Sequence, residues 1–237
     1  MKPKIRLISF DLDNTLWDVD KIILRAEQDM RAWMADNAPE SLALYQSEQI
    51  SELRKRVVRD HPEMVHDLTF MRLRVLEGVM ARAGYNDAES RTLAQRAFDV
   101  FFEGRNRVEF FPGALETLRY LSEEFQLIAL TNGNADIHRA GLSDYLSHAF
   151  SSADVGQSKP HRDMFETPLR RLKLNAPEAI HIGDNLVDDI AGANAVGMHS
   201  IWVNLSDRPL QSSDAQPSRE VRSLEEIVGA VAEIAQN

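Results

Sequence analysis

Two aspartates near the N-terminus carry the most specific chemical signal in the sequence. Asp11 and Asp13 directly follow residues 5–10, a short apolar run with the length and β-branched character of a buried strand. Because side chains alternate along an extended backbone, both carboxylates are expected on one face, with Leu12 on the other. Two like charges this close need a cation or a shared proton, and a divalent cation with oxygen ligands suits them. The competing interpretation is an Asp-rich and Asn-rich turn that caps the next helix.

Three later segments place polar residues after an apolar run or ahead of a helix. They are Thr131-Asn132-Gly133, Lys159-Pro160 and Gly183-Asp184, the last followed by Asp188 and Asp189. Each segment alone is weak evidence for a functional site, because such segments are usually turns, the starts of surface helices or acidic helix N-termini. Their order along the chain is specific: two acids, a hydroxyl with an amide, a lysine, and a further acid.

The elements around these residues alternate between strands and helices. Strands are predicted at residues 5–10, 125–130, 148–151, 179–182 and 199–203, and helices between the later strands at 114–124, 135–146, 160–174 and 187–196. This alternation predicts an α/β fold with a parallel sheet, whose strand ends would gather the polar residues at one edge. Residues 204–220 are predicted to be a loop before a closing helix at 224–235.

Residues 18–107 have a different character. Apolar residues recur there at helical spacing, for example Ile22, Ala26 and Met30, and the pattern predicts four helices and no strand. A helical block between one strand and a later strand–helix alternation indicates an insertion. We therefore predict a core domain of residues 1–17 and 108–237 and an inserted helical domain of residues 18–107.

Composition narrows the function classes. The 237-residue chain has no cysteine, which excludes disulfides, cysteine-ligated zinc and thiol catalysis. Its formal net charge of −10 disfavours nucleic acid or an anionic membrane as partner, although small anions can still bind. No signal peptide is recognisable, and no apolar run approaches the roughly 20 residues that span a bilayer. We expect a soluble, cytoplasmic protein, and the sequence leaves its oligomeric state open.

With these motifs the sequence resembles the haloacid dehalogenase-like (HAD) hydrolase superfamily, in the branch with a helical cap inserted after the first strand. The resemblance covers essentially the whole chain and rests on residues 11–15 (DLDNT), 130–134 (LTNGN), Lys159-Pro160 and residues 183–190 (GDNLVDDI). Within that branch the segments look most like bacterial flavin mononucleotide phosphatases. The resemblance implies a Rossmann-like parallel-sheet core with a four-helix cap, and a Mg²⁺-dependent phosphatase that hydrolyses a small-molecule phosphate monoester.

The resemblance also implies roles for individual residues. Asp11 would be the nucleophile that forms an aspartyl-phosphate. Asp13 would protonate the leaving alkoxide and then activate water. Thr131 and the backbone of Asn132 would hold the phosphoryl oxygens, and Lys159 would offset their negative charge.

A metal site follows from the same resemblance. Mg²⁺ would be bound by Asp11, by the main-chain carbonyl of Asp13 and by Asp184, with water completing its shell. Asp188 and Asp189 are both eligible as the further acid of the last motif. Asp189 is favoured, as support for Lys159 or for a metal-bound water.

Residues outside the motifs are less informative. Trp17 lies near the predicted hinge and is expected to be a packed aromatic, although it could stack on a flat substrate. Arg72 and Arg74 flank an apolar helical stripe and could grip a substrate, although most such arginines are solvated.

Several other functions share the same core. A sugar phosphatase, a nucleotidase and a phosphomutase remain open alternatives, because the motifs do not identify the leaving group. A dehalogenase of the superfamily is disfavoured, since that chemistry uses the first aspartate without metal and lacks the second acid, which is Asp13 here. A receiver-type phosphoaspartate switch is typically half this length, and a non-catalytic phosphate-binding protein would be expected to lack one of the four charged motif residues.

Overall fold

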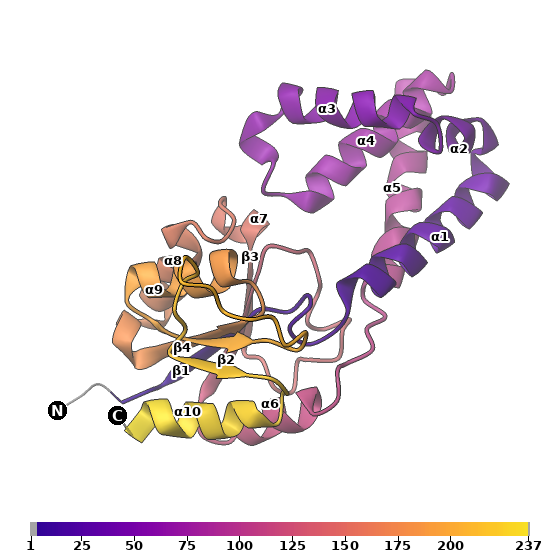
Figure 1. Ribbon diagram of the computed structural model, residues 1–237. Coiled ribbons are helices and arrows are strands. Elements are labelled where there is room, and N and C mark those ends of the chain that lie inside the picture. The colour runs from indigo at the N-terminus through magenta and orange to yellow at the C-terminus, as the bar shows by residue number, and fades with distance from the viewer. Residues whose placement is uncertain (1–3, 237) are drawn as a thin grey trace. The chain divides into compact units, whose positions relative to one another are not determined.

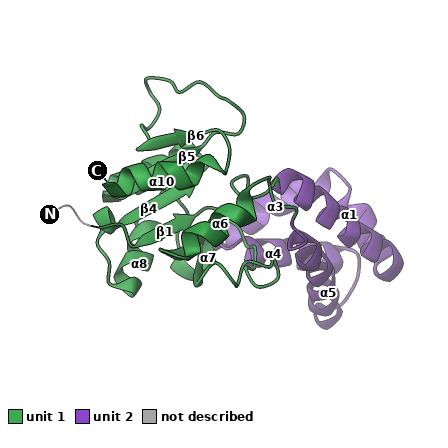
Figure 2. Cartoon of the chain, turned by 90° about the horizontal axis from the view of Figure 1, so that it is seen from below, with its two compact units in different colours: residues 1–18, 109–237 green, residues 19–108 purple. Residues whose placement is uncertain are grey.

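The computed structural model describes residues 4–236, so residues 1–3 and 237 of the predicted core domain lie outside the described part. The chain divides into two compact units, residues 1–18 with 109–237 and residues 19–108 (Figure 2). We call them the α/β unit and the helical unit. Their boundaries differ by one residue from those predicted for the core and inserted domains.

Within residues 4–236, the α/β unit contains a six-stranded parallel sheet in the order β3-β2-β1-β4-β5-β6 (Figure 1). The strands are β1 (Leu7–Phe10), β2 (Gln126–Thr131), β3 (His148–Ser151), β4 (Ala179–Gly183), β5 (His199–Val203) and β6 (Arg219–Val221). The order reverses at β1, because the chain adds β2 and β3 on one side and β4 to β6 on the other. Ligands of such sheets bind outside the carboxyl ends of the strands at this reversal. The predicted parallel α/β architecture is confirmed.

Strand β1 holds the centre of the sheet. All four of its residues are buried, and Phe10 lies opposite Ala129 of β2 and Ile182 of β4. Burial of its large apolar side chains contributes about 1.5–3 kcal/mol each. The pairing continues one residue beyond the strand, since the Asp11 N–H donates to the Ile182 carbonyl at 2.8 Å. The first motif residue is therefore held by the sheet and not by a free loop.

Helices cover both faces of this sheet. Helices α6 (Ala114–Ser122) and α10 (Glu226–Gln236) lie on one face, and α8 (Arg162–Leu172) and α9 (Gly192–Val196) lie on the other (Figure 1). Three short elements complete the unit: α7 (Ser152–Val155), the 3-10 turn η2 (Ala176–Glu178) and the π-helical turn η3 (Leu186–Ala191). Between these two helices and the sheet lies a buried apolar cluster, which includes Leu7, Ile128 and Leu130 of the strands and Met164, Phe165 and Ala193 of the helices.

The helical unit contains no strand among its residues, as predicted, but it has five α-helices where four were expected. They are α1 (Val19–Asn37), α2 (Pro39–Tyr45), α3 (Gln49–Asp60), α4 (Leu68–Arg82) and α5 (Asp87–Arg105), with the 3-10 turn η1 (Pro62–Met64). Their shared core includes Met30, Met34, Leu76, Met80 and Phe98. The additional helix is α2. Its first residue, Pro39, occupies the first helical turn, where its missing N–H costs no hydrogen bond.

Both arginines singled out in the helical unit are engaged inside it. Arg72 forms an ion pair with Glu27, and its guanidinium carbon lies 3.6 Å from the centre of the Phe101 ring. Arg74 donates to Glu77 at 2.6 Å. These contacts account for both side chains without a substrate.

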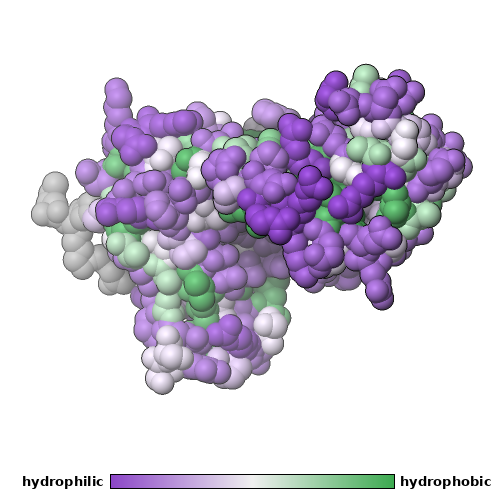
Figure 3. All heavy atoms as spheres, turned by 90° about the horizontal axis from the view of Figure 1, so that it is seen from above, coloured by the Kyte–Doolittle hydropathy of each residue, from purple (hydrophilic) through white to green (hydrophobic). Residues whose placement is uncertain are grey.

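Two further elements differ from the prediction. Residues 135–146 form turns and no helix, because the Asp136 carboxylate accepts the backbone N–H of His138 at 2.8 Å and Gly141 has a φ of 78°. Strand β6 overlaps the end of residues 204–220, which were predicted to be a loop, and it pairs with β5 over three residues. No helix in the described part of the chain has both the length and the apolar character needed to cross a bilayer. The face in Figure 3 is mostly hydrophilic.

Candidate active site

The residues assigned by resemblance meet at one cavity of about 160 Å³ in the α/β unit. It is lined by all seven of them, Asp11, Asp13, Thr131, Asn132, Lys159, Asp184 and Asp189, together with Asn14, Gly133, Asn185 and Asp188. They converge because β1, β2 and β4 are parallel neighbours and end at the same edge. Their catalytic roles remain predictions.

The turn after β1 places the first two acids over the cavity. Asn14 adopts the left-handed region with a φ of 62°, which asparagine tolerates, and its N–H donates to the Trp17 carbonyl at 2.8 Å. The buried Thr15 hydroxyl lies 3.3 Å from an oxygen of Asp11 and 3.3 Å from one of Asp184. Thr15 belongs to the predicted motif, but its bridging position was not predicted.

Trp17 is a packed residue that also contacts the site. It is fully buried, its ring meets Phe110 edge to face at 5.7 Å, and its indole N–H donates to Asp13 Oδ1 at 2.8 Å. Trp17 is therefore packed, as expected, and its hydrogen bond to Asp13 was not predicted from the sequence.

We expect Trp17→Phe to lower kcat about tenfold with little change in KM, because Phe keeps most of the packing but cannot donate to Asp13. Steady-state kinetics with an aryl phosphate measure this. Phe110→Leu is the matched control, since it disturbs the same ring contact and leaves the indole N–H in place. An equal loss of kcat in both variants would assign the effect to packing.

Lys159 is buried and uses all three ammonium donors. Its Nζ donates to Asp11 Oδ1 at 2.6 Å, to Asp189 Oδ1 at 2.7 Å and to the Leu130 carbonyl at 2.8 Å. A buried ammonium is tolerable only when paired and fully hydrogen-bonded. One cation therefore links two carboxylates from different parts of the chain.

The structure brings Asp189, and not Asp188, against Lys159. The second oxygen of Asp189 accepts the Asn185 N–H at 2.9 Å, whereas the Asp188 carboxylate lies 3.5 Å from the Asn132 side-chain amide. Gly183 makes the approach possible, because a Cβ at that position would lie 2.3 Å from the Asp189 carboxylate. The π-helical turn η3, which begins after Asn185, carries Asp189 inward.

Thr131 and Asn132 hold the loop after β2 against the lysine segment. The Asn132 side chain accepts the Lys159 N–H at 2.6 Å and donates to the Lys159 carbonyl at 3.0 Å. The Thr131 hydroxyl accepts the Gly133 N–H at 2.9 Å. The side-chain amide of Asn132 is therefore committed to positioning Lys159, and its backbone carbonyl accepts the Ser152 hydroxyl at 3.1 Å, so its backbone N–H is the group left for a ligand.

Burial and charge set the protonation of the cluster. Burial raises the pKa of Asp11 to about 8, although the nearby Lys159 ammonium partly opposes the shift. Burial also raises the pKa of Asp184 to about 6. Burial alone would raise the pKa of Asp189, but Lys159 and the hydrogen bond from His181 outweigh it and hold the pKa well below its usual range. Burial alone would lower the pKa of the Lys159 ammonium, but its two carboxylate partners, Asp11 and Asp189, outweigh burial and raise that pKa.

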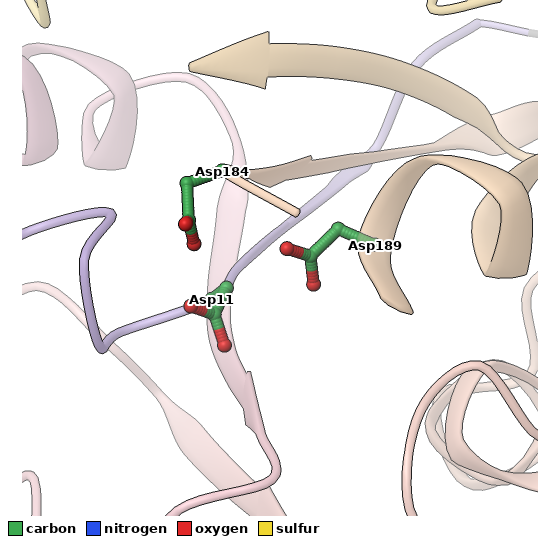
Figure 4. Close-up of side chains that lie close together, drawn as sticks. All are labelled: Asp11, Asp184 and Asp189. Carbon is green, nitrogen blue, oxygen red and sulfur yellow. The ribbon is translucent and has the colours of Figure 1, made fainter. Parts of the chain in front are cut away.

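Three carboxylates are close enough together to bind one cation. Oxygens of Asp11, Asp184 and Asp189 lie within 4.8 Å of one another, and Figure 4 shows the three groups converging from separate segments. Hard oxygen ligands suit a hard divalent cation, whose charge would stabilise the two carboxylates with raised pKa values. Among the described residues, Asp189 accepts three hydrogen bonds of 3.0 Å or less, from Lys159, His181 and Asn185, whereas Asp11 accepts one such bond and Asp184 only the longer contact of Thr15, so Asp11 and Asp184 are the better metal ligands.

The sequence of the chain matches the haloacid dehalogenase-like hydrolase family over residues 5–197. The chain belongs to this family.

Individual relatives of this HAD hydrolase carry more specific names. It is 34% identical over 200 residues to 5-amino-6-(5-phospho-D-ribitylamino)uracil phosphatase YigB of Escherichia coli (strain K12), covering 84% of each chain. It is 33% identical to ribulose-1,5-bisphosphate 5-phosphatase of Halopiger xanaduensis, covering 89% of this chain and 88% of that one. The crystal structure of a 2-haloacid dehalogenase from Pseudomonas syringae pv. Tomato DC3000 superposes with a TM-score of 0.92 at 38% identity, covering 97% of this chain and 99% of that one.

These comparisons confirm the predicted superfamily, and the named phosphatases support the predicted class of this HAD hydrolase, a phosphoric monoester hydrolase. They do not test the narrower resemblance to flavin mononucleotide phosphatases.

Two buried polar residues of the HAD hydrolase escaped sequence reasoning. Ser9 and His181 interrupt the otherwise apolar strands β1 and β4, and they lie at paired positions beneath Asp189. A polar residue in the middle of each apolar run was the available signal.

Proposed function

We propose that the chain is a Mg²⁺-dependent phosphatase that hydrolyses a phosphate monoester of a small metabolite through an aspartyl-phosphate on Asp11. The observation that carries the proposal is the Asp11 carboxylate at the wall of a cavity, with Lys159 at 2.6 Å and Asp184 beside it. Hydrolysis of an anionic ester requires positive charge and a nucleophile at the same place, and this cavity combines the two.

The reaction would proceed in two displacements. In the first, an oxygen of Asp11 attacks phosphorus, the bond from phosphorus to the substrate oxygen breaks, and Asp13 gives its proton to the departing alcohol. In the second, Asp13 takes a proton from water as the water oxygen attacks phosphorus, and the bond to Asp11 breaks. One alcohol and one inorganic phosphate result from one ester and one water.

Asp11, Asp184 and the main-chain carbonyl of Asp13 would hold the metal. When bound, Mg²⁺ supplies positive charge that offsets the repulsion between the nucleophilic carboxylate and the phosphoryl oxygens. Thr131 and the backbone of Asn132 would hold the phosphoryl oxygens, and Lys159 would share their remaining charge. Asp189 would keep Lys159 in place.

We propose a substrate with a phosphate on the terminal carbon of a hydroxylated chain. The names of two relatives describe such esters, a 5-phosphoribityl group and the 5-phosphate of a ribulose bisphosphate. Flavin mononucleotide carries a phosphoribityl chain and falls in this class. Sugar phosphates and nucleotides with a primary phosphate are the alternatives within it, and phosphomutase action would yield an isomer without free phosphate.

Phosphate release from a panel of these esters tests the proposal. We expect release with Mg²⁺, loss of release on chelation by EDTA, and recovery when Mg²⁺ is restored. Absence of phosphate release from every ester, or release that EDTA leaves unchanged, would contradict it.

The affinity for Mg²⁺ should depend on pH. In the metal-free protein the raised pKa values of Asp11, about 8, and Asp184, about 6, keep protons on these ligands at low pH. Because Mg²⁺ must displace those protons, we expect its dissociation constant to fall about tenfold per pH unit between pH about 6 and about 8, and to level off above. Calorimetric titration in two buffers of different ionisation enthalpy measures both the constant and the protons released. A dissociation constant independent of pH would contradict the assigned ligands.

A dehalogenase is the second candidate, because the similar crystal structure from Pseudomonas syringae bears that name. Asp13 argues against it, since dehalogenation by the superfamily is expected to proceed without a second acid or a metal. Halide release from 2-chloropropionate, measured beside phosphate release with and without EDTA, separates the two activities. Halide release that persists in EDTA, with no phosphate release, would replace the phosphatase proposal.

A further inference from the structure

A polar line runs through the buried centre of the sheet and ends at the cavity. Ser9 of β1 and His181 of β4 lie opposite each other in the strand register, and both side chains are at most 1% exposed. Polar groups in such a place destabilise the fold unless they are hydrogen-bonded. Neither residue lines the cavity, so neither is explained by contact with a substrate.

The contacts form a continuous chain toward the nucleophile. Ser9 Oγ lies 2.8 Å from His181 Nδ1, and His181 Nε2 lies 3.0 Å from Asp189 Oδ1. The same carboxylate oxygen accepts Lys159 Nζ at 2.7 Å, and that ammonium donates to Asp11 at 2.6 Å. Four hydrogen bonds thus connect the middle of the sheet to the candidate nucleophile.

The direction of each bond follows from the chemistry of the partners. An ionised Asp189 can only accept, so His181 Nε2 carries the proton. Burial lowers the pKa of His181, which favours the neutral ring, and Nδ1 is then an acceptor. The Ser9 hydroxyl donates to it in preference to the Ile180 carbonyl, which is farther away at 3.3 Å. Asp189 therefore selects the tautomer protonated at Nε2, and the Ser9 hydroxyl complements it by donating to Nδ1.

Asp189 needs this donor to keep its orientation. Its carboxylate turns about a broad two-fold torsion, and only the Asn185 N–H, at 2.9 Å from Oδ2, would remain besides the lysine itself. A turned carboxylate would move the acceptor that Lys159 depends on. The Lys159 ammonium would then be held only by Asp11 and the Leu130 carbonyl, and its position relative to Asp11 would change.

We propose that His181 is a positioning residue: its Nε2–H, with Nδ1 hydrogen-bonded to Ser9, orients Asp189 so that the Lys159 ammonium is held against Asp11, the candidate nucleophile. The catalytic consequence rests on the proposed phosphatase function, whereas the hydrogen-bond chain does not. The competing explanation is packing, because the His181 ring also meets Phe165 edge to face at 5.2 Å.

A matched pair of variants separates positioning from packing. His181→Gln and His181→Met both remove the ring and have similar length, but only Gln can donate to Asp189. We expect His181→Met to lower kcat about 10–100-fold, with KM within about twofold of wild type, and His181→Gln to recover most of that loss. Thermal unfolding should fall below the wild type in both variants, since both lose the Phe165 contact, and further in His181→Met, which also leaves Asp189 without a donor, so kcat is compared well below both midpoints. Equal kcat values in the two variants would overturn the proposal.

A measurement on the wild-type protein keeps the test independent of folding and of activity. Long-range ¹H–¹⁵N correlation with labelled histidine identifies which ring nitrogen of His181 bears the proton at the assay pH. We expect a neutral ring protonated at Nε2, and a ring protonated at Nδ1 would overturn the proposed chain. If the wild type releases no phosphate from any ester, the proposed function fails while this spectrum still tests the hydrogen-bond chain through His181.

Discussion

Replacing Asp11 by Asn is expected to lower kcat for an aryl phosphate by at least about 10⁴-fold, the scale on which loss of a nucleophile acts. The amide of Asn is a poor nucleophile and cannot form the acyl phosphate. The fold should persist, because Asn occupies the same volume and Lys159 retains Asp189 and the Leu130 carbonyl as partners. Steady-state kinetics and thermal unfolding report the two properties separately.

Asp144→Asn is the matched control for this variant, since it makes the same substitution at an exposed position of the α/β unit, outside the cavity. Its kcat should equal that of the wild type. Acid-quenched wild-type enzyme should carry a phosphoryl group on Asp11 by mass spectrometry, and Asp11→Asn should carry none. Turnover retained by Asp11→Asn would reject Asp11 as nucleophile.

Replacing Lys159 by Met should cost both activity and stability. The substitution keeps most of the side-chain volume but leaves the buried Asp11 and Asp189 without their shared cation. Removing one partner of a buried ion pair typically costs about 3–5 kcal/mol of unfolding free energy. Urea denaturation measures this cost, and phosphate release should become undetectable because the charge facing the phosphoryl group is lost.

The pH dependence of that cost identifies its origin. Without the ammonium, burial should raise the folded-state pKa of Asp189 above its unfolded value of about 3.9. A carboxyl group whose pKa is higher in the folded state than in the unfolded state stabilises the fold at pH values below its unfolded-state pKa. That stabilisation is lost as the pH rises through the folded-state pKa. The deficit of Lys159→Met should therefore be smallest near the acidic end of the stable range and grow toward neutral pH. A deficit that is constant with pH would indicate lost packing instead.

Lys55→Met serves as the control, because Lys55 is exposed and forms an ion pair with the exposed Glu52. Exposed pairs contribute little, so this variant should unfold at the same urea concentration as the wild type. A matching loss in Lys55→Met would show that the assay responds to charge in general.

The motif residues and the α/β architecture could be predicted from sequence because their signals are local. An apolar run followed by Asp11 and Asp13 identifies a strand and the polar residues at its end without knowledge of its neighbours. Alternation of strands and helices then implies a parallel sheet, and parallel strands bring their carboxyl ends to one edge. Residues as distant as Asp11 and Asp184 could thus be assigned to one site.

The elements that were missed depend on weaker local signals or on tertiary contacts. Helix α2 begins at Pro39, a residue equally typical of a loop, and residues 135–146 have a helical pattern that the Asp136 side chain and Gly141 interrupt. Strand β6 has three residues and is stabilised by its pairing with β5.

The sequence by itself indicated that Asp11, Asp13, Thr131, Lys159 and Asp184 lie together at one edge of a sheet, and these residues line one cavity. Only the tertiary structure decided that Asp189 and not Asp188 meets Lys159, because a π-helical turn and the absence of a Cβ at Gly183 set that approach. It alone placed His181 and Ser9 beneath the site. Which side chains become buried partners depends on packing between distant segments, and spacing along one segment does not encode that packing.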